Sequence, residues 1–298
     1  MKRHLAQLAA AVTAQLVVAS MASAQTFEEY RHTVDAPYAG RYEARIGGSS
    51  EPEAEKLRLD IGASIDILTL RDTTNLAPRS GATRLSFGAD FFTWSRLRSE
   101  PNFKFPVEAI DYYFGINAAI RLARIAGHAP LISEVRLRLA HISAHLVDGE
   151  RALGDTAWTA PTVYSREFVD AMIAADGERL ARAIGLGSAS IRPYLGALHI
   201  FHTIPSLAAA TSPYLGFDGW IEPTASLPFV VRAGYELRVN TELDAAIAEH
   251  HARLGLKLGR PHTNGLLLET TWYSGRSMYG QSFGQRESYV SLGFGIDY

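Results

Sequence analysis

The chain has 298 residues, a formal net charge of −2 and no cysteine. The missing cysteine excludes disulfides, thiolate metal sites and cysteine nucleophiles, and the near-neutral charge argues against nucleic acid as a partner. Apolar residues make up 47% of the chain, yet after the N-terminus they form no run long enough for a membrane-spanning helix.

The N-terminus has the three parts of a secretory signal peptide. A basic start at residues 1–4 precedes an apolar stretch at 5–20, and Ala22-Ser23-Ala24 forms a small-x-small site before Gln25. We therefore expect residues 1–24 to be removed on export. Because no linker or change in composition divides the remainder, residues 25–298 are predicted to form one domain.

Apolar and polar residues alternate along most of this domain. In residues 56–69, Leu57, Leu59 and Ile61 share one face while Arg58 and Asp60 occupy the other. A period of two predicts a β-strand. Similar segments are predicted near 41–48, 56–69, 84–91, 110–121, 131–146, 161–174, 188–203, 214–223, 228–241, 248–259, 264–275 and 287–298.

The polar face of these strands is unusually charged for a soluble protein. The charged positions that oppose apolar neighbours are Arg136, Arg138, Arg232, Glu236, Arg238, Lys257 and Glu269. Lipid outside and a packed network of ion pairs inside would account for both faces. The predicted fold class is therefore all-β, a transmembrane antiparallel up-and-down β-barrel of about twelve strands.

The final strand supports this prediction. The same alternation continues to an aromatic residue at the end of the chain, Tyr298, through the apolar positions Val290, Leu292, Phe294 and Ile296. This pattern resembles the C-terminal signal of bacterial outer-membrane barrels. The resemblance implies an outer-membrane location, membrane lipid as a partner, and recognition of the last strand by the outer-membrane insertion machinery.

Connection lengths predict the orientation of the barrel. If Tyr298 ends on the periplasmic side, the connections at 95–105, 147–160, 204–213 and 276–286 are extracellular, and those at 125–130, 224–227 and 260–263 are periplasmic. The first group is mostly long and the second is short, as in known barrels. Two predicted periplasmic connections, 70–81 and 175–187, are exceptions because they are long.

The predicted strand at 131–146 carries the candidate site. His141, Ser143 and His145 continue the apolar parity of this strand, so they would face lipid, where polar side chains are costly. Counted from the intervening connection, Glu167 on the next strand lies at about the depth of His141. Glu167 would orient His141, and His141 would act as the base for Ser143, so the three residues would form a catalytic triad.

Two other interpretations stay open for His141, Ser143 and His145: a bulge in the strand, or a strand that has already left the bilayer at these residues. A bulge near Ala140 would turn His141, Ser143 and His145 into the lumen, where they would be ordinary polar residues.

The neighbours His250 and His251 face opposite ways on a strand and have no carboxylate at ligand spacing, which favours a solvated loop or an interface position over a metal site.

Two family resemblances follow from these segments. The chain resembles the bacterial family labelled domain of unknown function 1207 in four stretches, at 141–150, 164–167, 275–281 and 289–298. It departs from the family's pattern at Ile142, Ala144, Val147 and Gly149. The resemblance implies an outer-membrane barrel and no particular activity. The His141-x-Ser143 spacing resembles outer-membrane phospholipase A, whose activity requires calcium and dimerisation. That resemblance departs after Ser143, where no Asn-Gly follows, and Glu167 would replace the asparagine that orients the histidine.

Three functions are compatible with the sequence. The first is an outer-membrane barrel with a structural role or a narrow conduit, without a cofactor. The second is a lipid-facing serine esterase or phospholipase that uses His141, Ser143 and Glu167, with calcium only in this case. The third is a soluble periplasmic β-sandwich that binds a small ligand.

Overall fold

A computed structural model describes residues 32–71, 83–122, 132–145, 163–224, 228–243 and 245–297. The expected signal peptide at 1–24 and the terminal Tyr298 lie outside these residues. Among the residues described, no helix is long and apolar enough to cross a bilayer.

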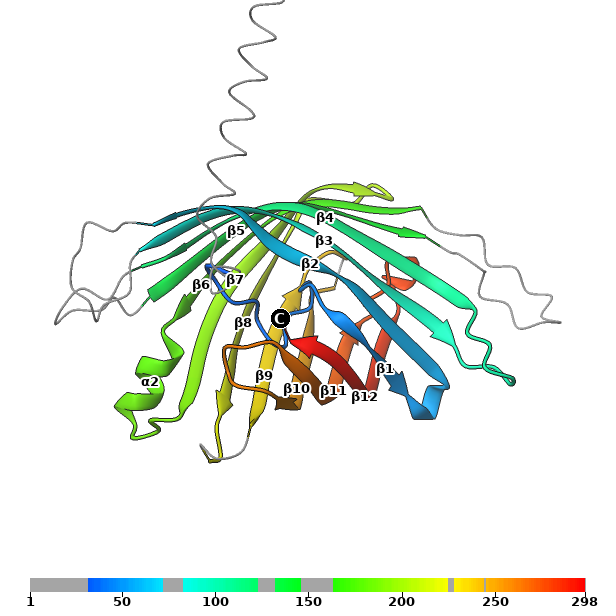
Figure 1. Cartoon of the computed structure of the whole chain (residues 1–298). Helices are drawn as coiled ribbons and strands as arrows, with labels where there is room; N and C mark the ends of the chain where they lie inside the picture. Colours follow the sequence, from blue (N-terminus) through cyan, green and yellow to red (C-terminus); the bar gives the residue numbers. More distant parts are fainter. Residues whose placement is uncertain are drawn as a thin grey trace, which may run out of the picture.

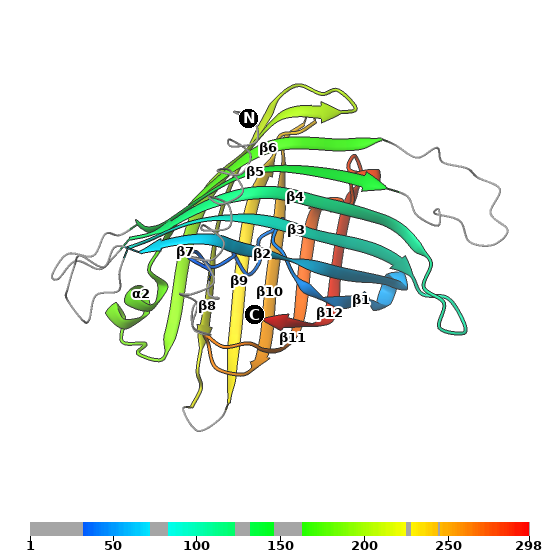
Figure 2. The same cartoon turned by 45° about the horizontal axis from the view of Figure 1, so that its top comes forward.

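Twelve antiparallel strands form one closed barrel (Figures 1 and 2). The strands are β1 (Ile46–Glu51), β2 (Lys56–Arg71), β3 (Arg84–Arg98), β4 (Val107–Arg121), β5 (Ile132–His145), β6 (Tyr164–Ala175), β7 (Ala189–Ile204), β8 (Ala210–Ile221), β9 (Phe229–Asn240), β10 (Ile247–Leu258), β11 (Gly265–Arg276) and β12 (Arg286–Asp297). Each strand pairs with its neighbours in sequence, and β1 pairs with β12 to close the wall. The all-β barrel is confirmed, and the two-sheet sandwich is wrong.

The wall is apolar outside and polar inside. Ile116 on β4 is 62% exposed and Phe294 on β12 is 64% exposed, whereas Asp90, Arg138 and Asp170 are buried in the lumen. Because successive side chains on a strand point to opposite faces, the alternation in the sequence produces this division directly. An exposed apolar belt around a charged interior is the arrangement of a membrane β-barrel.

The lumen is packed with ion pairs between strands. Arg138 Nη2 lies 2.6 Å from Asp170 Oδ2, and Arg192 Nη1 lies 2.7 Å from Glu134 Oε2. The charged residues singled out in the sequence, with Arg136 and Lys257 among them, do face inward. Pairing matters here because an isolated charge away from water is costly.

The segment 32–45 crosses the lumen as irregular chain with turns, between the β2–β5 side of the wall and the β9–β12 side (Figure 1). The sequence predicted a strand at 41–48, but β1 begins only at Ile46. Arg41 and Glu43 are the reason, because both are bound in the lumen: Arg41 to Glu249 at 2.6 Å and Glu43 to Arg136 at 2.6 Å. The alternation of residues 41–45 therefore reflects contacts inside the barrel.

Other predicted boundaries also needed correction. β3 continues to Arg98 and β8 begins at Ala210, so the connections after β3 and before β8 are shorter than predicted. The long connection at 175–187 contains a short helix, α2 (Gly177–Ala183), capped by the Asp176 side chain. The other exception, 70–81, falls mostly outside the described residues.

The two ends of the barrel differ. One end, here called the α2 end, carries α2 and the turn at 259–264, and lies opposite the end that carries the 3-10 turns η2 (Pro52–Ala54) and η3 (Gly280–Ser282). Near η3 the lumen contains a buried cluster that includes Trp94, Tyr113 and Tyr279. The segment around η3 folds into the mouth, where Gly280 N donates to Asp111 Oδ2 at 2.9 Å.

The exposed apolar belt predicts a sharp effect of a charge on the outer face. We expect Ile116→Arg to lower the free energy of unfolding in lipid vesicles by about 2–4 kcal/mol, because arginine near the middle of a barrel wall must leave water. Phe103→Arg is the matched control, since Phe103 is 92% exposed in the connection after β3. Equal unfolding midpoints in urea for the two variants would contradict a lipid-facing belt at Ile116.

Candidate functional site

The outer face of β5 carries the three polar residues singled out in the sequence. Side chains on β5 alternate without interruption around Ala140: Ala140, Ile142 and Ala144 are buried in the lumen, and His141 and Ser143 lie on the outer face with the exposed His145. The pairing of β5 with β4 has no register shift, and the shift with β6 lies at Ile132/Glu134, far from the histidines. A bulge near Ala140 that turns these residues inward is therefore wrong.

Glu167 on β6 lies directly beside His141. The two residues are register partners, and His141 Nδ1 lies 2.7 Å from Glu167 Oε1. Because a carboxylate only accepts, the Nδ1 of His141 carries the proton in this hydrogen bond. The expected common depth of His141 and Glu167 is confirmed, and the Nε2 of His141 is left free of this bond.

A second histidine that the sequence analysis missed completes the cluster. His202 Nδ1 donates to the other carboxylate oxygen of Glu167, and the His202 side chain is 59% exposed. Strict alternation along β7 from His199 would point His202 inward. A bulge opposite Glu167/Phe168 adds Phe201 to β7 and returns His202 to the outer face. A bulge of this kind has no reliable signal in one sequence.

Serine hydroxyls lie next to this His-Glu-His row. Ser143 is the register partner of Ser165, and Ser165 Oγ donates to Glu167 Oε1 at 3.1 Å. Within the described residues, no hydrogen bond joins His141 to Ser143, so the structure brings His141 and Glu167 into contact while Ser143 lies two residues along the same face. Phe114 on β4 borders the row, 6.5 Å from His141 between ring centroids.

The cluster does not form a metal site. Within the described part of the chain, no three His, Cys, Asp or Glu side chains are grouped so that they could hold a metal ion. Calcium prefers several oxygen ligands, and both carboxylate oxygens of Glu167 already accept from histidines. The described residues at this site therefore do not fit a calcium ion.

The histidine pair on β10 is also placed by the structure. His250 lies on the outer face, with Nδ1 2.7 Å from Tyr235 Oη, whereas His251 is 5% exposed and lines the lumen. Both belong to β10, so of the two predicted positions, a solvated loop or an interface, the loop is wrong. The expectation that they face opposite ways is confirmed.

Comparison with known proteins gives a likeness in fold. No family model matches the sequence, and no curated protein matches it significantly. Two solved structures resemble the chain: outer membrane phospholipase A from Escherichia coli, with a TM-score of 0.49, and an active-site mutant of that protein, with a TM-score of 0.48. In both cases the identity is 14%, and the alignment covers 91% of this chain and 95% of the other. At this identity and TM-score the likeness is one of fold alone and assigns no activity to this chain.

Proposed function

We propose that this barrel resides in the bacterial outer membrane and is a lipid-facing serine esterase that hydrolyses an ester bond of a membrane lipid. The supporting observation is the hydrogen bond of 2.7 Å between Glu167 Oε1 and His141 Nδ1, on an outer wall that also carries Ser143. A polar row in an apolar belt needs a compensating role. A carboxylate that orients a histidine beside a serine is the arrangement that activates a hydroxyl nucleophile.

The proposed chemistry uses each residue once. His141 Nε2 takes the proton of Ser143 Oγ as the oxygen attacks the ester carbonyl, and His141 then gives that proton to the departing alcohol. In the second half of the reaction, a water molecule gives its proton to His141 Nε2 and attacks the acyl-serine, and His141 returns the proton to Ser143 Oγ as the fatty acid leaves. Glu167 keeps the proton on His141 Nδ1 and stabilises the positive charge that forms on the ring. The absence of a hydrogen bond between His141 and Ser143 is compatible with this role, because catalytic hydrogen bonds often form or tighten only when substrate binds.

The position of the row favours a lipid substrate. His141 and Ser143 lie within the last five residues of β5, toward the η3 end, which the connection lengths assign to the outside. The side chains open toward the surroundings of the barrel, with 39% of the His141 side chain exposed. A substrate would therefore arrive sideways from the bilayer, with its ester group near the interface and its acyl chains along the apolar belt.

The packing of the lumen favours this proposal over a conduit. The segment 32–45 crosses the lumen (Figure 1), and the buried aromatic cluster occupies the lumen near η3. A narrow conduit or a purely structural barrel remains the alternative. Under that alternative, the purified protein should hydrolyse no ester.

Removing the charge of Glu167 is expected to slow turnover strongly. Purified protein in detergent with calcium, included so that no ion is limiting, is given a fluorescent diacyl phospholipid, and release of fatty acid is measured. We expect Glu167→Gln to lower kcat about 10²–10⁴-fold with little change in KM, because the imidazolium loses its counter-charge and the ring its fixed tautomer.

His202→Gln is the informative companion to this variant. The amide can still donate to Glu167, so we expect a much smaller loss of kcat than in Glu167→Gln. Equal activity of Glu167→Gln and the unaltered protein would refute the role of the carboxylate. No fatty acid release from the unaltered protein would refute the proposed function as a whole.

A further inference from the structure

A second candidate site lies inside the barrel, in a cavity of about 1300 Å³ that extends from the α2 end into the lumen. Its lining runs from exposed turn residues such as His262 and Asn264 to the strand residues Arg58 and His251 deeper inside. The cavity is therefore open to water at the α2 end. The closed strand ladder separates it from the lipid around the barrel.

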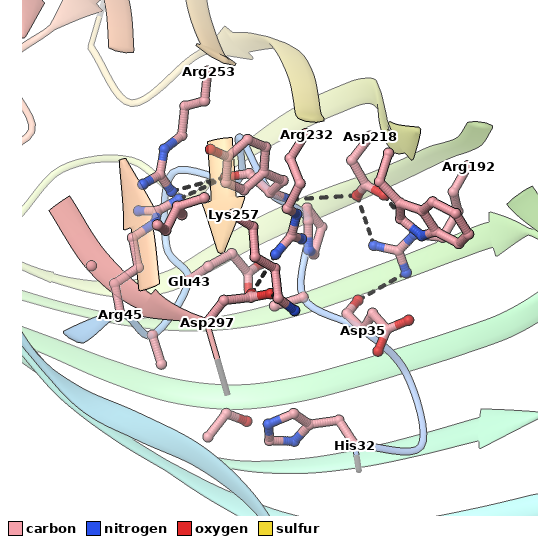
Figure 3. A pocket seen from close by; sticks show the side chains of 18 of the residues that line it. His32, Asp35, Glu43, Arg45, Arg192, Asp218, Arg232, Arg253, Lys257 and Asp297 are labelled. Carbon is pink, nitrogen blue, oxygen red and sulfur yellow. Dashed lines mark hydrogen bonds and ion pairs between the residues drawn. The ribbon is translucent and has the colours of Figure 1, made fainter. Parts of the chain in front are cut away.

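Figure 3 shows how charges are arranged in this cavity. Arg45 and Arg253 lie on one side, and Arg192, Asp218 and Asp35 lie on the other. Most cations in the lining are held by carboxylates, in the pairs Arg58–Asp60, Arg121–Glu134, Arg192–Asp218, Arg232–Asp297, Arg253–Glu269 and Lys257–Asp297. These pairs leave little attraction for an added ion.

Arg45 differs from the other cations in this lining. Its guanidinium donates to two backbone carbonyl oxygens, those of Gly40 at 2.7 Å and Tyr38 at 3.3 Å. In the part of the chain that the structure describes, no carboxylate forms a salt bridge with Arg45; Arg253 and Arg58 act on it with like charge, and Asp60 and Glu269 act on it with opposite charge. Burial and then the charge of Arg253 lower the pKa of Arg45 to about 10, so the group stays charged at neutral pH.

His251 provides an independent observation at the same place. Its side chain is 5% exposed, it lines the cavity, and its Nδ1 is buried without a hydrogen-bond partner. The charges of Arg45, Arg253 and Arg58 all act on this ring. A buried polar atom without a partner costs free energy, and a bound ligand with acceptor oxygens would satisfy it.

We propose that Arg45 and His251 form a binding site for the phosphate or carboxylate group of a water-soluble anionic ligand that enters the barrel from the α2 end. The guanidinium fork matches the geometry of such oxyanions. An oxyanion beside Arg45 would accept hydrogen bonds from its guanidinium and from the His251 ring, while Arg58 and Arg253 stay paired with Asp60 and Glu269. Lipid is not the source, because the paired wall keeps lipid molecules out of the lumen.

The test measures anion binding to the full chain in detergent. Inorganic phosphate, and acetate in a parallel series, are titrated by calorimetry at constant ionic strength, so that general screening does not change. We expect saturable binding of at least one anion. Arg45→Gln should raise the dissociation constant about tenfold or more, because a charge-assisted contact is lost, whereas Arg45→Lys should retain part of the affinity.

Arg260→Gln is the matched control for this test. Arg260 also lies at the α2 end and is paired with Glu222, but it is outside the cavity lining, so its loss should leave anion binding unchanged. Heat-modifiable gel mobility of each variant confirms that the barrel has formed. Absence of saturable binding to the unaltered protein, or equal affinities for Arg45→Gln and Arg260→Gln, would overturn the proposal.

Discussion

Replacing Ser143 with alanine is expected to abolish the release of fatty acid, with a loss of at least about 10³-fold in kcat. The substitution removes the only proposed nucleophile and leaves His141 and Glu167 in contact. Because one hydroxyl is lost from the outer face of β5, the stability of the barrel should hardly change. Single-turnover measurement of fatty acid release, with KM determined in parallel, separates this loss of chemistry from a loss of lipid binding.

Thr211→Val is the matched control for Ser143→Ala. Thr211 is an exposed polar residue on the outer face of β8, with its hydroxyl 2.8 Å from His199 Nδ1, and it has no place in the proposed chemistry. Its loss should leave the rate unchanged. If Ser143→Ala retained the rate of the Thr211→Val variant, another residue would have to be the nucleophile.

The second large effect is expected in the lumen, where Glu43→Gln should lower the free energy of unfolding by about 3–5 kcal/mol. Glu43 is 8% exposed and binds Arg136 through both carboxylate oxygens, at 2.6 and 3.0 Å. Glutamine leaves Arg136 charged and buried without a carboxylate. Urea unfolding in lipid vesicles, followed by tryptophan fluorescence, measures the difference, with the exposed Glu53→Gln as control.

The effect of Glu43→Gln should depend on pH. Burial raises the pKa of Glu43, but the charges of Arg136 and Arg138 outweigh it and hold the pKa below its ordinary value. A carboxyl group whose pKa is lowered by folding contributes stability above its unfolded pKa of about 4.3 and loses that contribution as the pH falls. The gap between Glu43→Gln and the unaltered protein should therefore narrow below about pH 4. A gap of constant size down to acid unfolding would show that the charge of Glu43 is not its cause.

The wall of the barrel and the direction of most side chains follow from the alternation of residues along the chain. Alternation is a local property, because each residue on a strand points away from its neighbours' face. For this reason the outward positions of His141 and Ser143 followed from Val135, Leu137 and Leu139 alone. The common depth of His141 and Glu167, obtained by counting residues from the connection between their strands, agrees with the register of β5 and β6, in which the two residues are partners.

Features that join distant parts of the chain depend on how the whole barrel folds. Residues 32–45 enter the lumen because Arg41 and Glu43 find partners about 208 and 93 residues away, and no local pattern encodes such a partner. The bulge that turns His202 toward Glu167 depends on the pairing of β6 with β7. The cavity around Arg45 exists because the barrel closes around that segment, so the charge balance there is a property of the assembled lumen.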